Sequence, residues 1–239
     1  MIHKALACTL ALAHPAGAIE LALPVACILG ETCYIQQYPD HDPGAAATDF
    51  TCGPLSYDGH DGTDFALPNR AAMEAAVSVL AAAPGVVKGL RDGVADFAPA
   101  IPGKECGNGV VIDHGQGWET QYCHLRQGSV LVKSGDRVET GTPLGQIGQS
   151  GQAEFPHLHL SVRQNGAKLD PFAPTARACG AGGDDLWASD LPYQPGGLLS
   201  VGITDQVPEY QAIKAGLPSP DLPTAAPALV VWAHVFGTR

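Results

Sequence analysis

The stretch Phe155-Pro156-His157-Leu158-His159-Leu160 decides how this sequence is interpreted, because its histidines and leucines alternate. In a β-strand, residues two apart point to the same face. A strand here would place His157 and His159 side by side and turn Leu158 and Leu160 towards a core. Neutral imidazole is the commonest protein ligand for metal ions, and zinc sites gather ligands from several elements. The stretch therefore predicts part of a metal site.

Two other segments offer partners for these histidines. Gly59–Phe65 carries His60 and Asp64 four residues apart, and a strand-like run ends at His124. Two histidines plus one carboxylate, with a fourth position open to water, form a recurring catalytic zinc pattern. A lone His-x-His pair among nine histidines is unremarkable, whereas three such segments together favour a metal site.

The order of these residues resembles that in lysostaphin-type (LytM-like) zinc endopeptidases, which cut peptide cross-links in bacterial cell walls. Gly107–Gly115 and Ser134–Gly145 also resemble segments of that family, and the resemblance covers roughly residues 53 to 173. It implies a mainly β fold, with an antiparallel sheet or barrel-like peptidase domain. The short β-runs and glycine-rich turns up to Arg163 agree with an antiparallel β domain.

The resemblance also implies roles for five residues. His60, Asp64 and His159 would bind one Zn²⁺ per chain, and His124 and His157 would be catalytic residues beside it. One of this pair would orient or deprotonate the metal-bound water, and the other would hydrogen-bond the developing oxyanion. The sequence leaves the division of roles open. The implied partner is peptidoglycan, through its peptide stems or cross-bridges, with a D-alanyl-diaminopimelyl bond as the leading expectation.

The sequence also suggests roles for four residues outside this set of five. By its place in the resembled segment, Asn108 is expected to contact substrate, and Tyr122 is expected to line the groove. Asp113 would either orient a ligand imidazole or sit with His114 at a hairpin turn, where Asp and Gly are favoured.

Composition limits the classes of protein. With 239 residues, 45% hydrophobic and 15% charged, the chain is expected to hold one good core plus a smaller appendage. The net charge of −11 argues against nucleic acid as a partner, because no basic stripe is present to neutralise phosphates. It also argues against an electrostatic grip on anionic wall polymers. The oligomeric state is not indicated.

Residues 1–18 have the pattern of a secretory signal peptide, with Lys4, the apolar run Ala5–Ala13 and small residues at the cleavage site. We therefore expect an exported protein with no membrane span after cleavage, in a periplasm or, alternatively, outside the cell. A lipoprotein signal at Cys27 is disfavoured, because Pro24 stands where such a signal carries Leu or Val.

The cysteines predict three disulfides. Cys8 lies within the expected signal, and the remaining six form an even set in an exported chain. Fifteen pairings are open in principle. Folding Trp118–Cys123 back on Val110–Asp113 would bring Cys106 near Cys123. A short Cys27–Cys33 loop is a second expectation, and it would leave Cys52 with Cys179. A cysteine zinc site is disfavoured, because no Cys-x-x-Cys is present.

The chain divides into four expected segments. A signal peptide (1–18) precedes a disulfide-stapled arm (19–52), a zinc metallopeptidase domain (53–179), and a linker with a β-rich extension (180–239). Within the peptidase domain, the alanine-rich run 69–80 predicts a helix that the resembled family lacks. Leu198–Ile203 and Ala228–Phe236 are the expected strands of the extension, which we interpret as part of a small, truncated β-sandwich.

Two readings from other classes compete with a zinc endopeptidase. A catalytically silent wall-binding regulator of another hydrolase, on the same fold, would normally have lost ligands, and all five residues are present. A lipoyl- or biotin-carrier module, suggested by Gly135–Val138, needs a lysine on a tight hairpin. It would also leave His60 and His159 unexplained.

Overall fold

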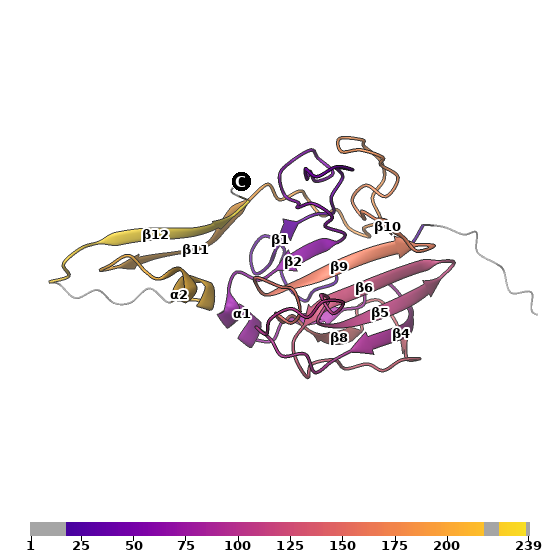
Figure 1. The fold of residues 1–239 in the computed structure, drawn as a ribbon, viewed down its shortest axis with the longest axis horizontal. Coiled ribbons are helices and arrows are strands. Elements are labelled where there is room, and N and C mark those ends of the chain that lie inside the picture. The colour runs from indigo at the N-terminus through magenta and orange to yellow at the C-terminus, as the bar shows by residue number, and fades with distance from the viewer. Residues whose placement is uncertain (1–17, 218–224, 238–239) are drawn as a thin grey trace, which may run out of the picture.

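The computed structural model describes residues 18–217 and 225–237, and the predicted signal peptide lies outside them except for Ala18. The fold is mainly β, as expected, and its strands are paired antiparallel (Figure 1). The largest sheet has the order β1-β2-β9-β6-β5-β4-β7, with β10 beside β9. It runs open from β1 to β7 and does not close into a barrel.

The strands of this sheet come from well-separated parts of the sequence. In spatial order they are β1 (Tyr34–Gln37), β2 (Thr63–Ala66), β9 (His157–Gln164), β6 (Trp118–Leu125), β5 (Asn108–Gly115), β4 (Gly85–Arg91) and β7 (Arg137–Val138), with β10 (Ala167–Leu169) off this path. A separate pair joins β3 (Ser78–Leu80) to β8 (Pro143–Gln146).

Strand β9 has the alternation that the sequence predicts. Leu158, Leu160 and Val162 are fully buried in the hydrophobic core, together with Phe65 of β2. The intervening histidines therefore share the opposite face. Because β9 lies between β2 and β6, its histidines are flanked by residues from both neighbouring strands.

The alanine-rich run is helical over a shorter range than predicted. Helix α1 spans only Arg70–Glu74, where the Asn69 side chain accepts a hydrogen bond from the Ala72 N–H. The left-handed backbone of Ala76 (φ +67°) interrupts the run. Val79 then enters the core on β3, opposite Gly145. Burial of a β-branched side chain in a strand pair thus overrides the helical propensity of the alanines.

All three predicted disulfides are present: Cys27–Cys33, Cys52–Cys179 and Cys106–Cys123. The N-terminal segment is also held by packing, since Leu21, Ile35 and Tyr38 belong to the same core cluster as Phe65. The Asp49 carboxylate accepts the Tyr193 hydroxyl at 2.7 Å, which ties this segment to the linker after the peptidase-like sheet.

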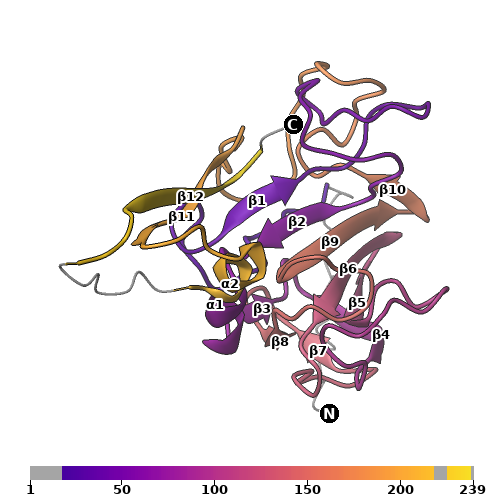
Figure 2. The same ribbon diagram turned by 60° about the vertical axis from the view of Figure 1, so that its left-hand side comes forward.

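The C-terminal extension is a ribbon and not a sandwich. Strands β11 (Gly197–Thr204) and β12 (Val230–Phe236) pair with each other, as predicted, and α2 (Tyr210–Ala215) lies between them in sequence. Within the described ranges no second sheet faces this pair. The base of the ribbon meets the larger sheet, where the rings of Tyr34 and Phe236 are 4.3 Å apart, and the rest of the ribbon extends away from that sheet (Figure 1). Helix α2 lies beside α1 (Figure 2).

The disulfides are expected to contribute unequally to stability. Loop-closure entropy predicts that breaking Cys52–Cys179, which spans 127 residues, costs about 5 kcal/mol of unfolding free energy. Breaking Cys27–Cys33, which spans 6 residues, is expected to cost about 2 kcal/mol. Urea denaturation of the two paired Cys→Ala variants measures the difference. Equal losses would show that loop length does not govern the effect.

Candidate active site

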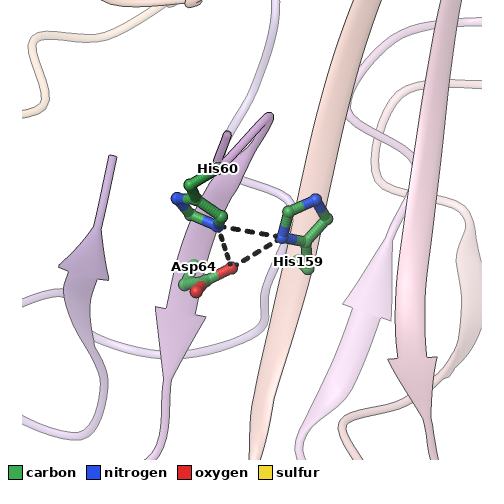
Figure 3. A group of neighbouring side chains, drawn as sticks. All are labelled: His60, Asp64 and His159. Atoms are coloured by element: carbon green, nitrogen blue, oxygen red, sulfur yellow. Dashed lines mark hydrogen bonds and ion pairs between the residues drawn. The ribbon is translucent and has the colours of Figure 1, made fainter. Parts of the chain in front are cut away.

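Three side chains converge at the β2–β9 pair. His60 Nε2 lies 3.2 Å from His159 Nδ1 and 3.3 Å from Asp64 Oδ1, and His159 Nδ1 lies 2.9 Å from Asp64 Oδ1 (Figure 3). Asp64 and His159 are direct partners in the strand register, and His60 stands in the turn before β2. The structure therefore brings together the three residues that the sequence predicts as metal ligands.

The outer nitrogen of each candidate ligand histidine is hydrogen-bonded to an oxygen. His60 Nδ1 donates to the Tyr38 carbonyl at 2.8 Å. His159 Nε2 donates to the Asp61 carboxylate at 3.1 Å and is 3.1 Å from the Ser161 hydroxyl. Metal-bound histidines usually make such bonds, which fix the ring and direct the other nitrogen towards the ion. The donor set fits a metal ion.

The electrostatics of the cluster favour positive charge. Burial alone would lower the pKa of His159, but its bonds to Asp61 and Asp64 raise the pKa to about 9. The contact with His159 holds the pKa of Asp61 well below its usual value. Burial would raise the pKa of Asp64, but His157 and His60 hold it well below the usual value. A metal cation bound by these side chains would take the place of the extra proton on His159.

His124 and His157 lie beside this cluster with their rings 4.6 Å apart. His157 Nε2 is 3.6 Å from Asp64 Oδ1, and the ring of His124 is 5.9 Å from that of His159. The Nδ1 of His124 donates to the Ser150 carbonyl, and that of His157 to the Phe155 carbonyl, each at 2.8 Å. In both rings, Nδ1 makes the anchoring hydrogen bond and Nε2 takes no part in it.

These two histidines are set to be neutral at pH 7. Burial, with a further contribution from His157 and His159, lowers the pKa of His124 to about 3. Burial also lowers the pKa of His157, although Asp64 opposes the shift. Since each Nδ1 carries the proton it donates, each Nε2 presents a lone pair that can accept a proton.

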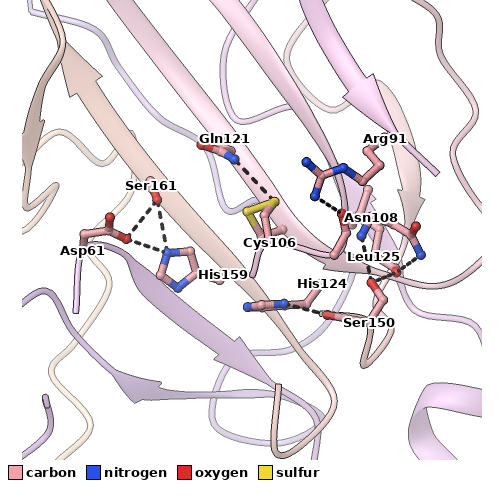
Figure 4. The surroundings of a disulfide bond; sticks show 12 residues. Asp61, Arg91, Cys106, Asn108, Gln121, His124, Leu125, Ser150, His159 and Ser161 are labelled. Carbon is pink, nitrogen blue, oxygen red and sulfur yellow. Dashed lines mark hydrogen bonds and ion pairs between the residues drawn. A yellow bond between two sulfur atoms is a disulfide. The ribbon is translucent and has the colours of Figure 1, made fainter. Parts of the chain in front are cut away.

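An unusual backbone conformation presents His124 to the site. Its φ is +64°, a region that non-glycine residues rarely adopt. The His124 N–H donates to the Cys106 carbonyl at 2.8 Å, and its carbonyl accepts from the Gly148 N–H at 3.0 Å. The Cys106–Cys123 disulfide lies next to this turn of the chain (Figure 4). Covalent and hydrogen-bond constraints together hold the conformation.

The cluster lies between two hollows of the surface. The larger, of about 530 Å³, is lined by Asp64, His124 and His157. The smaller, of about 230 Å³, is lined by His124 and His159. Because His124 borders both, an extended chain lying along them would pass directly beside the candidate ligands.

Asn108 and Tyr122 are structural residues, contrary to expectation. Asn108 is fully buried, and its amide nitrogen donates to the carbonyls of Val94 and Leu125. Tyr122 is also fully buried, and its hydroxyl accepts the N–H of Ala82 at 2.8 Å. A sequence motif does not show whether such a polar side chain points into the core or into the groove.

The hairpin interpretation of Asp113 and His114 is confirmed. Asp113 accepts the Gly115 N–H at 2.8 Å, and His114 Nδ1 donates to the Pro84 carbonyl. The carboxylate bonded to a candidate ligand imidazole belongs to Asp61, which the sequence interpretation passed over although it follows His60 directly. Ser161 was also missed, and strand parity with His159 is the signal that would have found it.

Comparisons with known proteins identify relatives of this chain. Residues 58–171 match the profile described as Peptidase family M23. Peptidoglycan DD-endopeptidase ShyA of Vibrio cholerae is 35% identical over 111 residues, which are 46% of this chain and 22% of that protein. DD-carboxypeptidase/endopeptidase Mpg of Neisseria gonorrhoeae is 33% identical over 116 residues, 48% of this chain and 22% of that protein. The chain thus spans about a fifth of these relatives' length.

Among solved structures, the catalytic domain of lysostaphin from Staphylococcus simulans is similar at 22% identity. The match covers 56% of this chain and 85% of that one, with a TM-score of 0.37. The catalytic domain of the M23 protein EnpA from Enterococcus faecalis gives 23% identity, 59% and 91% coverage, and a TM-score of 0.42.

Removing the carboxylate behind His159 is expected to weaken metal binding. Asp61→Asn should lower the affinity about 10- to 100-fold, because outer hydrogen-bond partners orient the ligand and raise its basicity. Isothermal titration of metal-stripped protein measures the change. Asp58→Asn, an exposed aspartate in the same turn, is the matched control and should bind as wild type does. Equal affinities for both variants would contradict the role assigned to Asp61.

Proposed function

We propose that this chain, whose residues 58–171 are a domain of peptidase family M23, is an exported zinc-dependent endopeptidase that hydrolyses peptide cross-links of bacterial peptidoglycan. The observation that carries the proposal is the convergence of His60, Asp64 and His159 beside two neutral histidines in a groove. Relatives named as peptidoglycan endopeptidases support the substrate.

The geometry of the three donor atoms suits zinc. Ligand atoms about 2.0–2.1 Å from a tetrahedral zinc ion lie about 3.3 Å from one another. The separations here are 2.9, 3.2 and 3.3 Å. Two imidazoles and one carboxylate are a recurring catalytic zinc set, and three protein ligands leave a fourth position for water. We therefore assign His60, Asp64 and His159 as the ligands of one zinc ion.

Zinc, when bound, supplies Lewis-acid polarisation and lowers the pKa of a bound water. The remaining chemistry falls to His124 and His157. As neutral imidazoles with a free Nε2, one accepts a proton from the attacking water. The imidazolium that forms then donates this Nε2 proton to the leaving amine, and the other histidine can hydrogen-bond the developing oxyanion only while its own Nε2 carries a proton. Their anchors at Ser150 and Phe155 fix the rings for this task.

Export is part of the same proposal. The three disulfides support folding in an oxidising compartment. Peptidoglycan itself lies outside the cytoplasm. In the parts of the chain that the structure describes, no helix has the length and apolar character needed to cross a bilayer. We place the mature protein in a periplasm, and recovery of all of it from the medium in a fractionation experiment would contradict this placement.

Peptide release from cross-linked peptidoglycan tests the function. Oxidised protein comprising residues 19–239 is expected to release cross-link fragments, and a zinc chelator should abolish the release. Mass spectrometry of the fragments identifies the bond, for which we expect D-alanyl-diaminopimelyl. Failure of folded, zinc-loaded protein to release any fragment would contradict the enzyme and favour a wall-binding regulator.

Single substitutions separate catalysis from metal binding. His124→Ala and His157→Ala are each expected to lower kcat about 10²- to 10⁴-fold, because a positioned proton-transfer group contributes that much. Zinc content should stay at one per chain in both variants. His60→Ala should lose the zinc itself. His114→Gln, which alters a hairpin histidine, serves as the control for activity and metal content. Full activity in His124→Ala or His157→Ala would contradict the assignment.

A further inference from the structure

The larger hollow beside the candidate site has cations on its wall. Of the arginines and lysines in the described parts of the chain, Arg70 and Lys214 line this hollow. Arg70 is the first residue of α1, in the run that the resembled family lacks, and Lys214 lies in the last turn of α2. The two helices are neighbours (Figure 2). Two segments distant in sequence thus bring positive charge to one groove.

Arg70 has hydrogen-bonding capacity that the protein does not use. Its guanidinium carbon lies 4.8 Å from the centre of the Phe97 ring, and its Nε is buried without a partner. Among the described residues, no side-chain hydrogen bond or ion pair reaches its guanidinium. Arg126, by contrast, is bonded to Glu74 at 2.6 Å. A half-buried guanidinium with free donors matches the planar fork of a carboxylate.

Lys214 is held in place by a contact that leaves its charge without an ion-pair partner among the described residues. Its Nζ donates to the Glu154 carbonyl at 3.0 Å and lies 5.6 Å from the Tyr210 ring. An ammonium has three donors, so two remain for another acceptor. Close packing fixes α2 here, since a Cβ on Gly216 would come within 2.8 Å of the Ala71 Cβ.

The acidic groups of this hollow do not cancel the two cations. Asp64 is a proposed metal ligand, and Glu154 is exposed with no ion pair to Arg70 or Lys214 in the described parts of the chain. The chain as a whole is acidic, with a net charge of −11 that already includes these two cations. Because most of its surface repels anions, a negatively charged substrate group would be drawn to these two residues in particular.

We propose that Arg70 and Lys214 form a subsite for a free carboxylate of the substrate peptide, an inference that rests on the proposed endopeptidase function. Arg70 follows Asp64 by six residues, so their Cα atoms are at most about 20 Å apart, the length of about six extended residues. The carboxylate would therefore lie a few residues from the scissile bond. Stem peptides containing diaminopimelate carry such carboxylates, whereas glycine bridges carry none within the bridge. The subsite selects stem-peptide cross-links.

Two matched peptides test this selection. One is a synthetic cross-linked stem dimer with free carboxylates, and the other has the same sequence with those groups as primary carboxamides. Zinc-loaded wild type is expected to cleave the first with about tenfold higher kcat/KM, since a charge-assisted bond contributes that much. Arg70→Gln should lose most of this preference through KM and cleave the amidated dimer as wild type does. Arg126→Gln, which removes an equivalent charge outside the groove, should keep the preference.

Binding to metal-stripped protein separates the subsite from the reaction. Calorimetry is expected to show about tenfold weaker binding of the carboxylate dimer to Arg70→Gln and to Lys214→Gln than to wild type. Such weakening without any turnover by zinc-loaded protein would overturn the proposed function and leave the subsite standing. Unchanged carboxylate preference in Arg70→Gln, or no binding of the dimer to wild type, would overturn the subsite.

Discussion

The pairing of Asp64 with His159 across strands β2 and β9 is the contact on which the candidate site depends. These residues are 95 positions apart, yet the antiparallel register sets them opposite each other. A shift of one residue in either strand would turn one of them into the core and a leucine or phenylalanine into the groove. The buried side chains Phe65, Leu158 and Leu160 oppose that shift, so the same apolar contacts that stabilise the sheet also fix the candidate metal ligands.

Around this pair, hydrogen bonds orient each imidazole. Four histidines point one nitrogen at a carbonyl or carboxylate oxygen: His60, His124, His157 and His159. This arrangement assigns the proton on each ring and leaves the opposite nitrogen for chemistry. As a consequence, histidines with raised and with lowered pKa values lie close together in the site. The pKa of His159 is raised by two carboxylates, whereas the pKa values of His124 and His157 are lowered by burial.

The sequence predicts most of the scaffold because strands and disulfides leave a mark in it: an alternation of neighbouring residues, or a count of cysteines. Alternation in His157–Leu160 identifies the strand, and the even set of cysteines leads to the disulfides that the structure contains. Tertiary contacts decide the rest. Val79 pairs into a strand and shortens the helix begun at Arg70, and Tyr122 turns into the core. The carbonyls that anchor the histidines belong to the backbone, so no residue type marks them. The ribbon that stands in place of the expected sandwich meets the larger sheet at Tyr34, through a contact between residues far apart in the sequence.

The disulfide beside His124 makes assembly of the site depend on oxidation. The backbone of His124 is bonded to the carbonyl of Cys106, and Cys106 is tied covalently to Cys123, the residue immediately before His124. In a reducing compartment this tie is absent, and the left-handed conformation must be held by hydrogen bonds alone. If the chain is the exported hydrolase proposed above, the covalent support of His124 would form only after the chain leaves the cytoplasm.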